Sequence, residues 1–194
     1  MRGQVDAKFS SCYFVSLRGF KLTMLARLRH LWLALITLPA LLFDAHRRRL
    51  FAEMRTFARG LPAALSAPLP QALATLTPPT SNLQSPISVS TLRRLADLTA
   101  LLGRRSPLGL CLRRSLVRYH FLRRAGLPLV LNFGARFKSG QPDREITGHA
   151  WVTLHGQPYF EDGENYRGFT GMLQYPPVSS DNLGVKTERL ERER

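Results

Sequence analysis

Two residues that lie far apart in the sequence, Cys111 and His149, have the side chains that acyl-transfer chemistry requires. A cysteine is nucleophilic as its thiolate, and the thiol pKa of about 8.5 falls at a helix N-terminus or beside an imidazolium. In this chemistry the thiolate attacks a carbonyl, the histidine moves the proton, and a third group orients the imidazole. The sequence therefore offers the first two members of a catalytic triad.

The residues around Cys111 have the pattern of a helix that begins just before it. Ser106 and Pro107 are typical of a helix opening, because serine caps the first turn and proline is tolerated there. An apolar face, a basic last turn and a terminating glycine come next in order (Leu112, Leu116, Tyr119, Arg123, Arg124, Gly126). Cys111 is therefore expected in or just past the first turn.

His149 lies in a segment predicted to be one strand of a hairpin. Residues 127–135 have the composition of a buried strand, 137–147 form a polar loop, and 148–154 and 157–162 flank a His155-Gly156 turn. Successive side chains of a strand point to opposite faces of the sheet. This alternation places Trp151 and Thr153 on the same face as His149. The opposite face carries Ala150, Val152 and Leu154.

The third catalytic group depends on the geometry of that turn. A two-residue turn pairs position 154 with 157 and places His149 opposite Asp162, whereas a type I turn with a bulge at Gly156 places it opposite Glu161. The two-residue turn is the simpler interpretation, so Asp162 is slightly favoured and both acids stay open. Each residue also has a structural alternative: the cysteine can be a small core residue, and the histidine and acids can belong to an ordinary strand.

The chain carries 28 Lys and Arg against 13 Asp and Glu, a formal net charge of +15. A nucleic acid, an anionic membrane surface and an acidic peptide are all attracted by such a field. The arginines are spread over predicted helices without interleaved aromatic residues or a glycine-rich phosphate loop, so solvated helix faces explain them equally well. With two cysteines and no metal-ligand spacing, neither a disulfide framework nor a metal site is predicted, and a reducing, cytoplasmic compartment is expected.

The first half of the chain is predicted to be helical and rich in proline. Residues 31–43 form an apolar run that is short of the about 20 residues of a membrane span, so a buried or interfacial amphipathic helix is favoured over a signal sequence or a span. A helix over 44–59 is expected to end at Gly60 and Pro62. Residues 61–90 indicate a linker with at most one short turn of helix. A further helix, capped by Ser90 and Thr91, is expected to stop at Gly103.

These elements divide the chain into a helical extension (1–60), a Pro-rich linker (61–90), an α+β core (91–178) and a charged tail (179–194). The first 23 residues are compositionally nondescript and are expected to be an upstream extension of the gene model. Weak contact of residues 24–59 with a membrane surface is left open.

Three blocks of sequence resemble the transglutaminase-like leader peptidases of lasso-peptide biosynthesis. They are Leu110-Cys111-Leu112-Arg113-Arg114-Ser115-Leu116, Leu122-Arg123-Arg124-Ala125-Gly126-Leu127-Pro128, and Gly148-His149-Ala150-Trp151-Val152 with His155-Gly156. The resemblance covers residues 90–175. It implies a papain/transglutaminase-like core, in which the helix that bears the cysteine packs on a small antiparallel sheet.

By the same resemblance, Cys111 and His149 are nucleophile and base, with Asp162 or Glu161 as the acid and with no cofactor. The implied activity is removal of the leader from a precursor peptide, whose new amine passes to an ATP-dependent macrolactam synthetase. The leader-binding domain is expected to be a separate protein, because the first 90 residues lack predicted strands. Two alternatives are an amide- or acyl-transferring enzyme with the same triad, and a non-enzymatic basic protein that binds membranes or nucleic acid.

Overall fold

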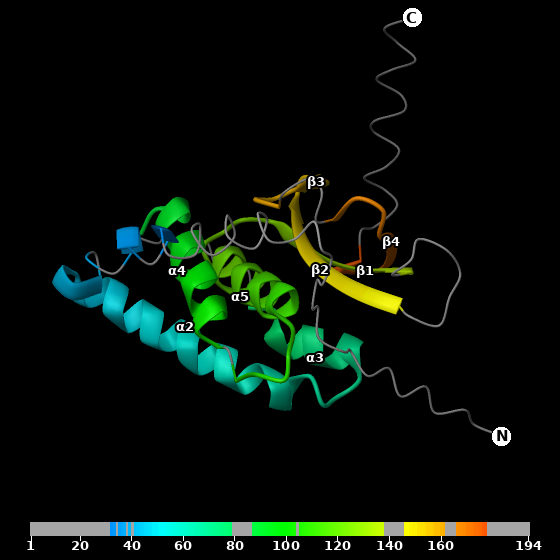
Figure 1. The fold of residues 1–194 in the computed structure, drawn as a ribbon, viewed down its shortest axis with the longest axis horizontal. Helices are drawn as coiled ribbons and strands as arrows, with labels where there is room; N and C mark the ends of the chain where they lie inside the picture. Colours follow the sequence, from blue (N-terminus) through cyan, green and yellow to red (C-terminus); the bar gives the residue numbers. More distant parts are fainter. Residues whose placement is uncertain are drawn as a thin grey trace, which may run out of the picture.

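A computed structural model describes residues 32–78, 87–137, 146–161 and 166–177, apart from positions 34, 38, 40 and 104. Four helices, α2 (Ala45–Ala64), α3 (Leu69–Leu76), α4 (Val89–Leu102) and α5 (Leu110–Arg124), precede the sheet. Its strands are β1 (Leu129–Phe137), β2 (Ile146–Leu154), β3 (Gln157–Pro158) and β4 (Thr170–Tyr175) (Figure 1). The predicted α+β class is confirmed. The expectations for residues 1–23, the charged tail and most of the 137–147 loop lie outside the described residues.

Helix α2 begins as its sequence predicts and ends later. The Asp44 side chain caps it by accepting hydrogen bonds from the backbone N–H groups of His46 and Arg47, at 2.9 and 3.1 Å. The predicted end at Gly60 and Pro62 is wrong, because the helix continues through both residues. Leu61 is fully buried there, and its packing compensates for the one backbone hydrogen bond that Pro62 cannot donate.

The segment between α2 and α4 contributes to the core. Within the expected Pro-rich linker, the 8 residues of α3 bury Ala72, Leu73 and Leu76. Helix α4 ends at Gly103 as predicted, but its N-cap is Ser88 rather than Ser90 and Thr91, because the Ser88 hydroxyl accepts from the Thr91 backbone N–H at 3.4 Å.

Helix α5 positions the candidate nucleophile. It begins at Leu110 with Gly109 as N-cap, three residues later than the predicted start at Pro107. The Ser106 hydroxyl instead accepts from the Leu108 N–H at 3.3 Å, which stabilises a turn ahead of the helix. Cys111 is the second residue of α5, so its predicted place in the first turn is confirmed.

The sheet has the order β3-β2-β1-β4, and all its strand pairs are antiparallel. His155 and Gly156 have φ angles of 49° and 77°, and position 154 pairs with 157. These values identify a two-residue hairpin turn, so the favoured turn register is confirmed. Strand β4 was not predicted, because most of its side chains are exposed and it carries little apolar alternation.

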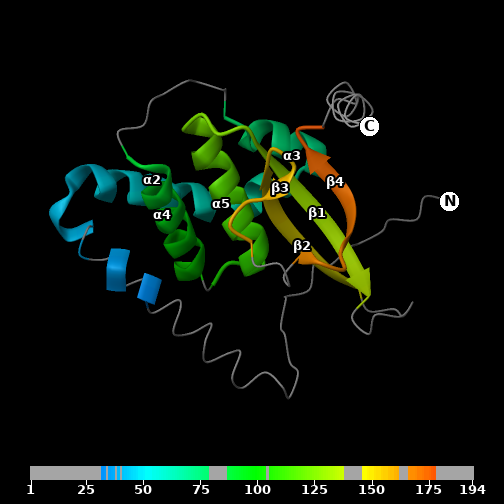
Figure 2. The same cartoon turned by 90° about the horizontal axis from the view of Figure 1, so that it is seen from above.

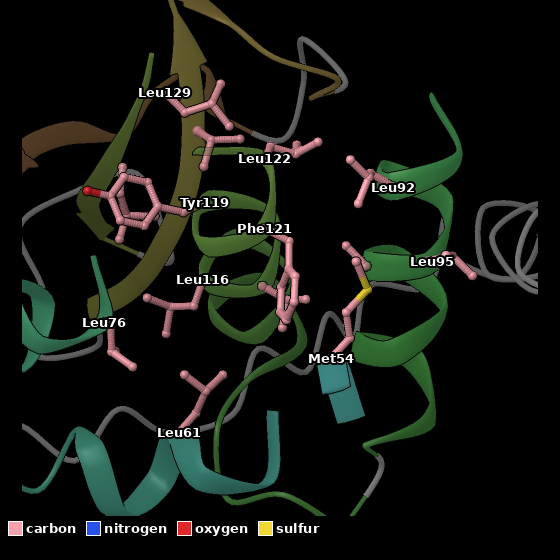
Figure 3. Close-up of a cluster of buried hydrophobic side chains, with 14 of the residues drawn as sticks. Met54, Leu61, Leu76, Leu92, Leu95, Leu116, Tyr119, Phe121, Leu122 and Leu129 are labelled. Carbon is pink, nitrogen blue, oxygen red and sulfur yellow. The ribbon is translucent and has the colours of Figure 1, made fainter. Parts of the chain in front are cut away.

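The hydrophobic core lies between the helices and one face of the sheet (Figures 1 and 2). Figure 3 shows the side chains of α5 at its centre, between those of α2, α3 and α4 (Leu116, Tyr119, Phe121, Leu122; Met54, Leu61, Leu76, Leu92, Leu95). Ala150 and Val152 of β2 belong to this core, whereas His149 and Trp151 do not. The predicted alternation along β2 is therefore confirmed, and the imidazole lies on the sheet face away from the helical core.

Candidate active site

Cys111 lies half-buried in the first turn of α5, two residues after the Gly109 N-cap. A side chain at position 109 would begin 3.9 Å from the Cys111 Sγ atom, so the glycine leaves the approach to the sulfur uncrowded. Arg113, two residues on, is buried; burial lowers the pKa of its guanidinium, and the nearby Cys111 opposes this by favouring the cation. The helix N-terminus and this arginine both favour a negative charge on the sulfur.

The His149 imidazole lies against aromatic rings on the outer face of the sheet. It stacks on Trp151 with ring centroids 5.9 Å apart and planes at 15°, and the Phe169 ring lies 5.2 Å away. The Nε2 atom of His149 is buried, and no described residue gives it a hydrogen bond. Buried polar atoms normally form hydrogen bonds, so a hydrogen-bond partner for this nitrogen is expected.

Gly134 of β1 faces His149 across the ladder and leaves room for Trp151. A Cβ atom at position 134 would lie 2.9 Å from both the Trp151 ring and the Thr170 carbonyl oxygen. We expect Gly134→Ala to lower the free energy of unfolding by about 1–3 kcal/mol, because neither the backbone nor the packed ring can give way cheaply. Urea denaturation measures this change.

Gly171 of β4 provides the matched control for that substitution. It pairs directly with Gly134, yet a Cβ atom at position 171 would meet nothing within 4 Å. Gly171→Ala is expected to leave the urea midpoint nearly unchanged. Equal effects of the two substitutions would show that the close approach of Trp151 does not decide the outcome.

Glu161 follows β3 and is held by two arginines of α5. Its side chain is fully buried, with Oε2 2.8 Å from Arg114 Nη2 and Oε1 3.1 Å from Arg118 Nη1. Burial raises the pKa of the Glu161 carboxyl, and the electrostatic effects of Arg114, Arg118 and His149 oppose that rise. The structure thus brings Glu161 into the electrostatic field of His149, but both of its oxygens already bind arginine.

Arg118 connects this acid to a second one, Asp97 of α4. Its guanidinium donates to both Asp97 carboxylate oxygens, at 2.6 and 2.9 Å, and also to the Phe160 carbonyl oxygen at 3.1 Å. Sequence analysis did not identify this network of Asp97, Arg114, Arg118 and Glu161. The spacing of four between Arg114 and Arg118 places both on one helix face, but only the fold brings the two acids to that face.

Asp162, the other candidate acid, lies outside the described residues. The ladder that would place it opposite His149 stops early, since β3 pairs with β2 only at Gln157 and Pro158. Phe160 then has a φ of 52°, so the chain leaves the extended conformation before Glu161. Counting outward from the turn is therefore not sufficient to place either acid.

Helix α5 contacts the edge of β2 where β3 has ended. The Val152 carbonyl oxygen still accepts from the Tyr159 N–H at 2.9 Å, whereas the next carbonyl on that edge, of Ala150, accepts from the Ser115 hydroxyl at 2.8 Å. Farther along, the Arg123 guanidinium donates to the Leu129 carbonyl oxygen at 2.8 Å. Two points of α5 are thus fixed relative to the sheet.

No group of His, Cys, Asp and Glu side chains among the described residues has the arrangement of a metal site. The described part of the chain also contains no helix whose length and apolar content would carry it across a membrane.

Comparison with known proteins gives one family. A family model described as the transglutaminase-like superfamily matches residues 57–174, which is more than half of the chain and includes Cys111, His149 and Glu161. Neither a curated protein nor a solved structure matches the chain.

Proposed function

Because the chain belongs to the transglutaminase-like superfamily, whose members are in general cysteine proteases and acyltransferases, we propose that it is a cysteine peptidase with Cys111 as nucleophile and His149 as base. Its substrate is the leader region of a ribosomally made, lasso-type precursor peptide. The observation that carries the proposal is the hydrogen bond from Ser115 of α5 to Ala150 of β2, which fixes the helix that bears the cysteine beside the strand that bears the histidine.

The level of Cys111 along β2 follows from the two contacts of α5. Ser115 donates a hydrogen bond to the Ala150 carbonyl oxygen of β2. Arg123 donates one to the carbonyl oxygen of Leu129, which pairs with Leu154 of β2. The helix and β2 therefore run in the same direction. The eight residue steps from Ser115 to Arg123 rise about 12 Å along the helix, and the four residue steps from Ala150 to Leu154 cover about 13 Å along the strand. One turn before Ser115, about 6 Å back along the helix, Cys111 comes level with Gly148, next to His149.

The contact of α5 with the open edge of β2 supports the proposed meeting of the thiol and the imidazole. His149 faces away from the helical core, and a helix lying flat on the core face would leave the sheet between the two groups. The Ser115 hydroxyl, however, binds the carbonyl that points out from the open edge of β2. In the proposed site, the Cys111 side chain passes this edge to meet the His149 ring on the outer face.

Asp162 and Glu161 have different roles in this proposal. Glu161 gives both oxygens to Arg114 and Arg118 and so anchors the segment after β3. We assign to Asp162, the next residue in the sequence, the role of acceptor for the buried Nε2 atom of His149. This assignment agrees with a general feature of catalytic triads, in which the acid holds the tautomer of the base.

The chemical steps are those of an acyl-enzyme. The Cys111 thiolate bonds to the scissile carbonyl carbon, and His149, which has taken the thiol proton, gives that proton to the leaving amine as the C–N bond breaks. Water then attacks the thioester carbonyl while His149 removes its proton, the C–S bond breaks, the sulfur regains a proton from His149, and the leader leaves as a carboxylic acid that ionises in solution. The freed amine of the core peptide goes to a separate ATP-dependent macrolactam synthetase.

Leader removal is supported by the Cys-Leu-x-Arg-Ser and Gly-His-Ala-Trp blocks, which lie on α5 and β2. The described part of the first 90 residues is helical, which supports a separate leader-binding protein as partner. A transferase remains the second candidate, because an acyl-enzyme can be resolved by an amine instead of water.

The test is cleavage of a precursor peptide in the presence of the leader-binding protein, followed by mass spectrometry. We expect wild-type protein to release leader and core, and Cys111→Ala and His149→Ala to release neither; Cys12→Ala is the matched cysteine control and should cleave normally. Cleavage by Cys111→Ala at the wild-type rate would refute the peptidase. A leader that gains the mass of an added amine, in place of water, would identify a transferase.

A further inference from the structure

Exposed apolar side chains gather in one short segment, residues 32–43. Of the ten large hydrophobic side chains that are exposed in the described part of the chain, five lie here (Trp32, Leu35, Ile36, Leu42, Phe43). Phe43 is 89% exposed and Trp32 is 63% exposed. Single exposed apolar residues are ordinary on a protein surface, but a gathering of this kind marks a binding face.

The exposed side chains share one side of a helix. The described residues of this segment are helical, and Trp32, Leu35, Ile36 and Phe43 recur at the spacing of a single helix face. Thr37 and Leu41 lie on the other side of the segment and are buried. The segment is therefore apolar both toward the protein and away from it, and its outer side, here called the apolar face, is left uncovered by the described residues.

In the sequence, arginines flank the 32–43 segment on both sides. Arg27 and Arg29 precede it in the sequence, and Arg47, Arg48 and Arg49 come after it in the first turn of α2. Arg47 pairs with Asp44, while neither Arg48 nor Arg49 forms an ion pair with any described residue. Arg48 also donates to the Leu42 carbonyl oxygen at 2.6 Å, which fixes the arginine run beside the apolar face.

From this juxtaposition we infer that the apolar face and its bordering arginines dock on an anionic lipid bilayer, with the helix lying in the plane of the interface. Apolar and tryptophan side chains on one side with arginines at the margin are typical of interfacial helices. The net charge of +15 adds long-range attraction to anionic lipid.

Docking at this face leaves the candidate active site accessible. Figures 1 and 2 show the 32–43 segment in blue at the end of the molecule away from the sheet, which carries His149. The inference is independent of the proposed peptidase activity, because it uses none of the residues assigned to the catalytic triad.

The experiment uses full-length protein and vesicles of phosphatidylglycerol and phosphatidylcholine, with pure phosphatidylcholine vesicles for comparison. The chain has two tryptophans, exposed Trp32 and buried Trp151, so a blue shift of fluorescence on vesicle addition reports Trp32. We expect the shift with anionic vesicles only, its disappearance in Trp32→Phe, and weaker co-sedimentation at high salt.

Variants then locate the face. Phe43→Ser should weaken vesicle affinity about tenfold, while Met172→Ser, which alters a 72% exposed residue of β4, should have no effect. Arg49→Glu should weaken binding, and Arg167→Glu, at another exposed position, should weaken it less. The inference is overturned if anionic vesicles do not bind, if Phe43→Ser and Met172→Ser bind equally, or if sedimentation shows a dimer that Phe43→Ser dissociates.

Discussion

Asp162→Ala is expected to reduce leader cleavage by about 10³–10⁴-fold while leaving the urea midpoint close to that of the wild type. In the proposed mechanism, Asp162 is the group that holds the tautomer of His149 and stabilises the imidazolium during acyl transfer. Glu161→Gln is expected to have the opposite effects, a loss of stability with little loss of cleavage. It removes a buried charge from Arg114 and Arg118, so the free energy of unfolding should fall by about 1–3 kcal/mol, with cleavage by the folded fraction largely retained.

The two substitutions are measured side by side, with precursor cleavage at a temperature where both variants are folded and with urea denaturation. Circular dichroism establishes the folded fraction used to correct each rate. If folded Glu161→Gln loses activity as completely as His149→Ala while Asp162→Ala cleaves normally, then Glu161 is the third catalytic residue. That result would assign the roles in reverse but would leave Cys111 and His149 in place.

Arg118→Met is expected to lower the free energy of unfolding by about 3–5 kcal/mol, the largest stability effect predicted for this chain. The Arg118 side chain is 3% exposed and binds the carboxylates of both Asp97 and Glu161. Methionine fills a similar volume but leaves two buried acids with less compensating charge. Because Arg118 also binds the Phe160 carbonyl oxygen, the variant should release the segment that leads to Asp162, the proposed catalytic acid, so cleavage should fall as well.

Arg124→Met is the matched control, since Arg124 pairs with Glu53 on the surface, where both side chains are more than 40% exposed. Exposed pairs contribute at most about 1 kcal/mol, so its urea midpoint should change little. The double variant Arg118→Met with Asp97→Leu should recover part of the lost stability, because it also removes one of the unpaired acids. Equal effects of Arg118→Met and Arg124→Met would contradict the buried network.

Local interactions determined much of this fold, and the sequence was sufficient to predict those parts. The first-turn position of Cys111, the glycine ends of α4 and α5, and the two-residue turn at His155-Gly156 each depend on residues close together in the chain. The alternation that separates His149 from Ala150 follows from the strand period alone. These features place the candidate nucleophile in the first turn of a helix and the candidate base on a strand.

Only the tertiary structure decided how those elements meet. Packing of Leu61 continues α2 through Pro62, pairing with β1 makes a strand of the weakly patterned β4, and the left-handed Phe160 ends the predicted hairpin before Glu161. The bond from Ser115 to Ala150 and the ion pairs from α5 to Glu161 join positions 35 to 47 residues apart. Local helix and strand propensities do not encode such contacts, because the contacts form only after packing of the core has brought α5 and the sheet to their final separation.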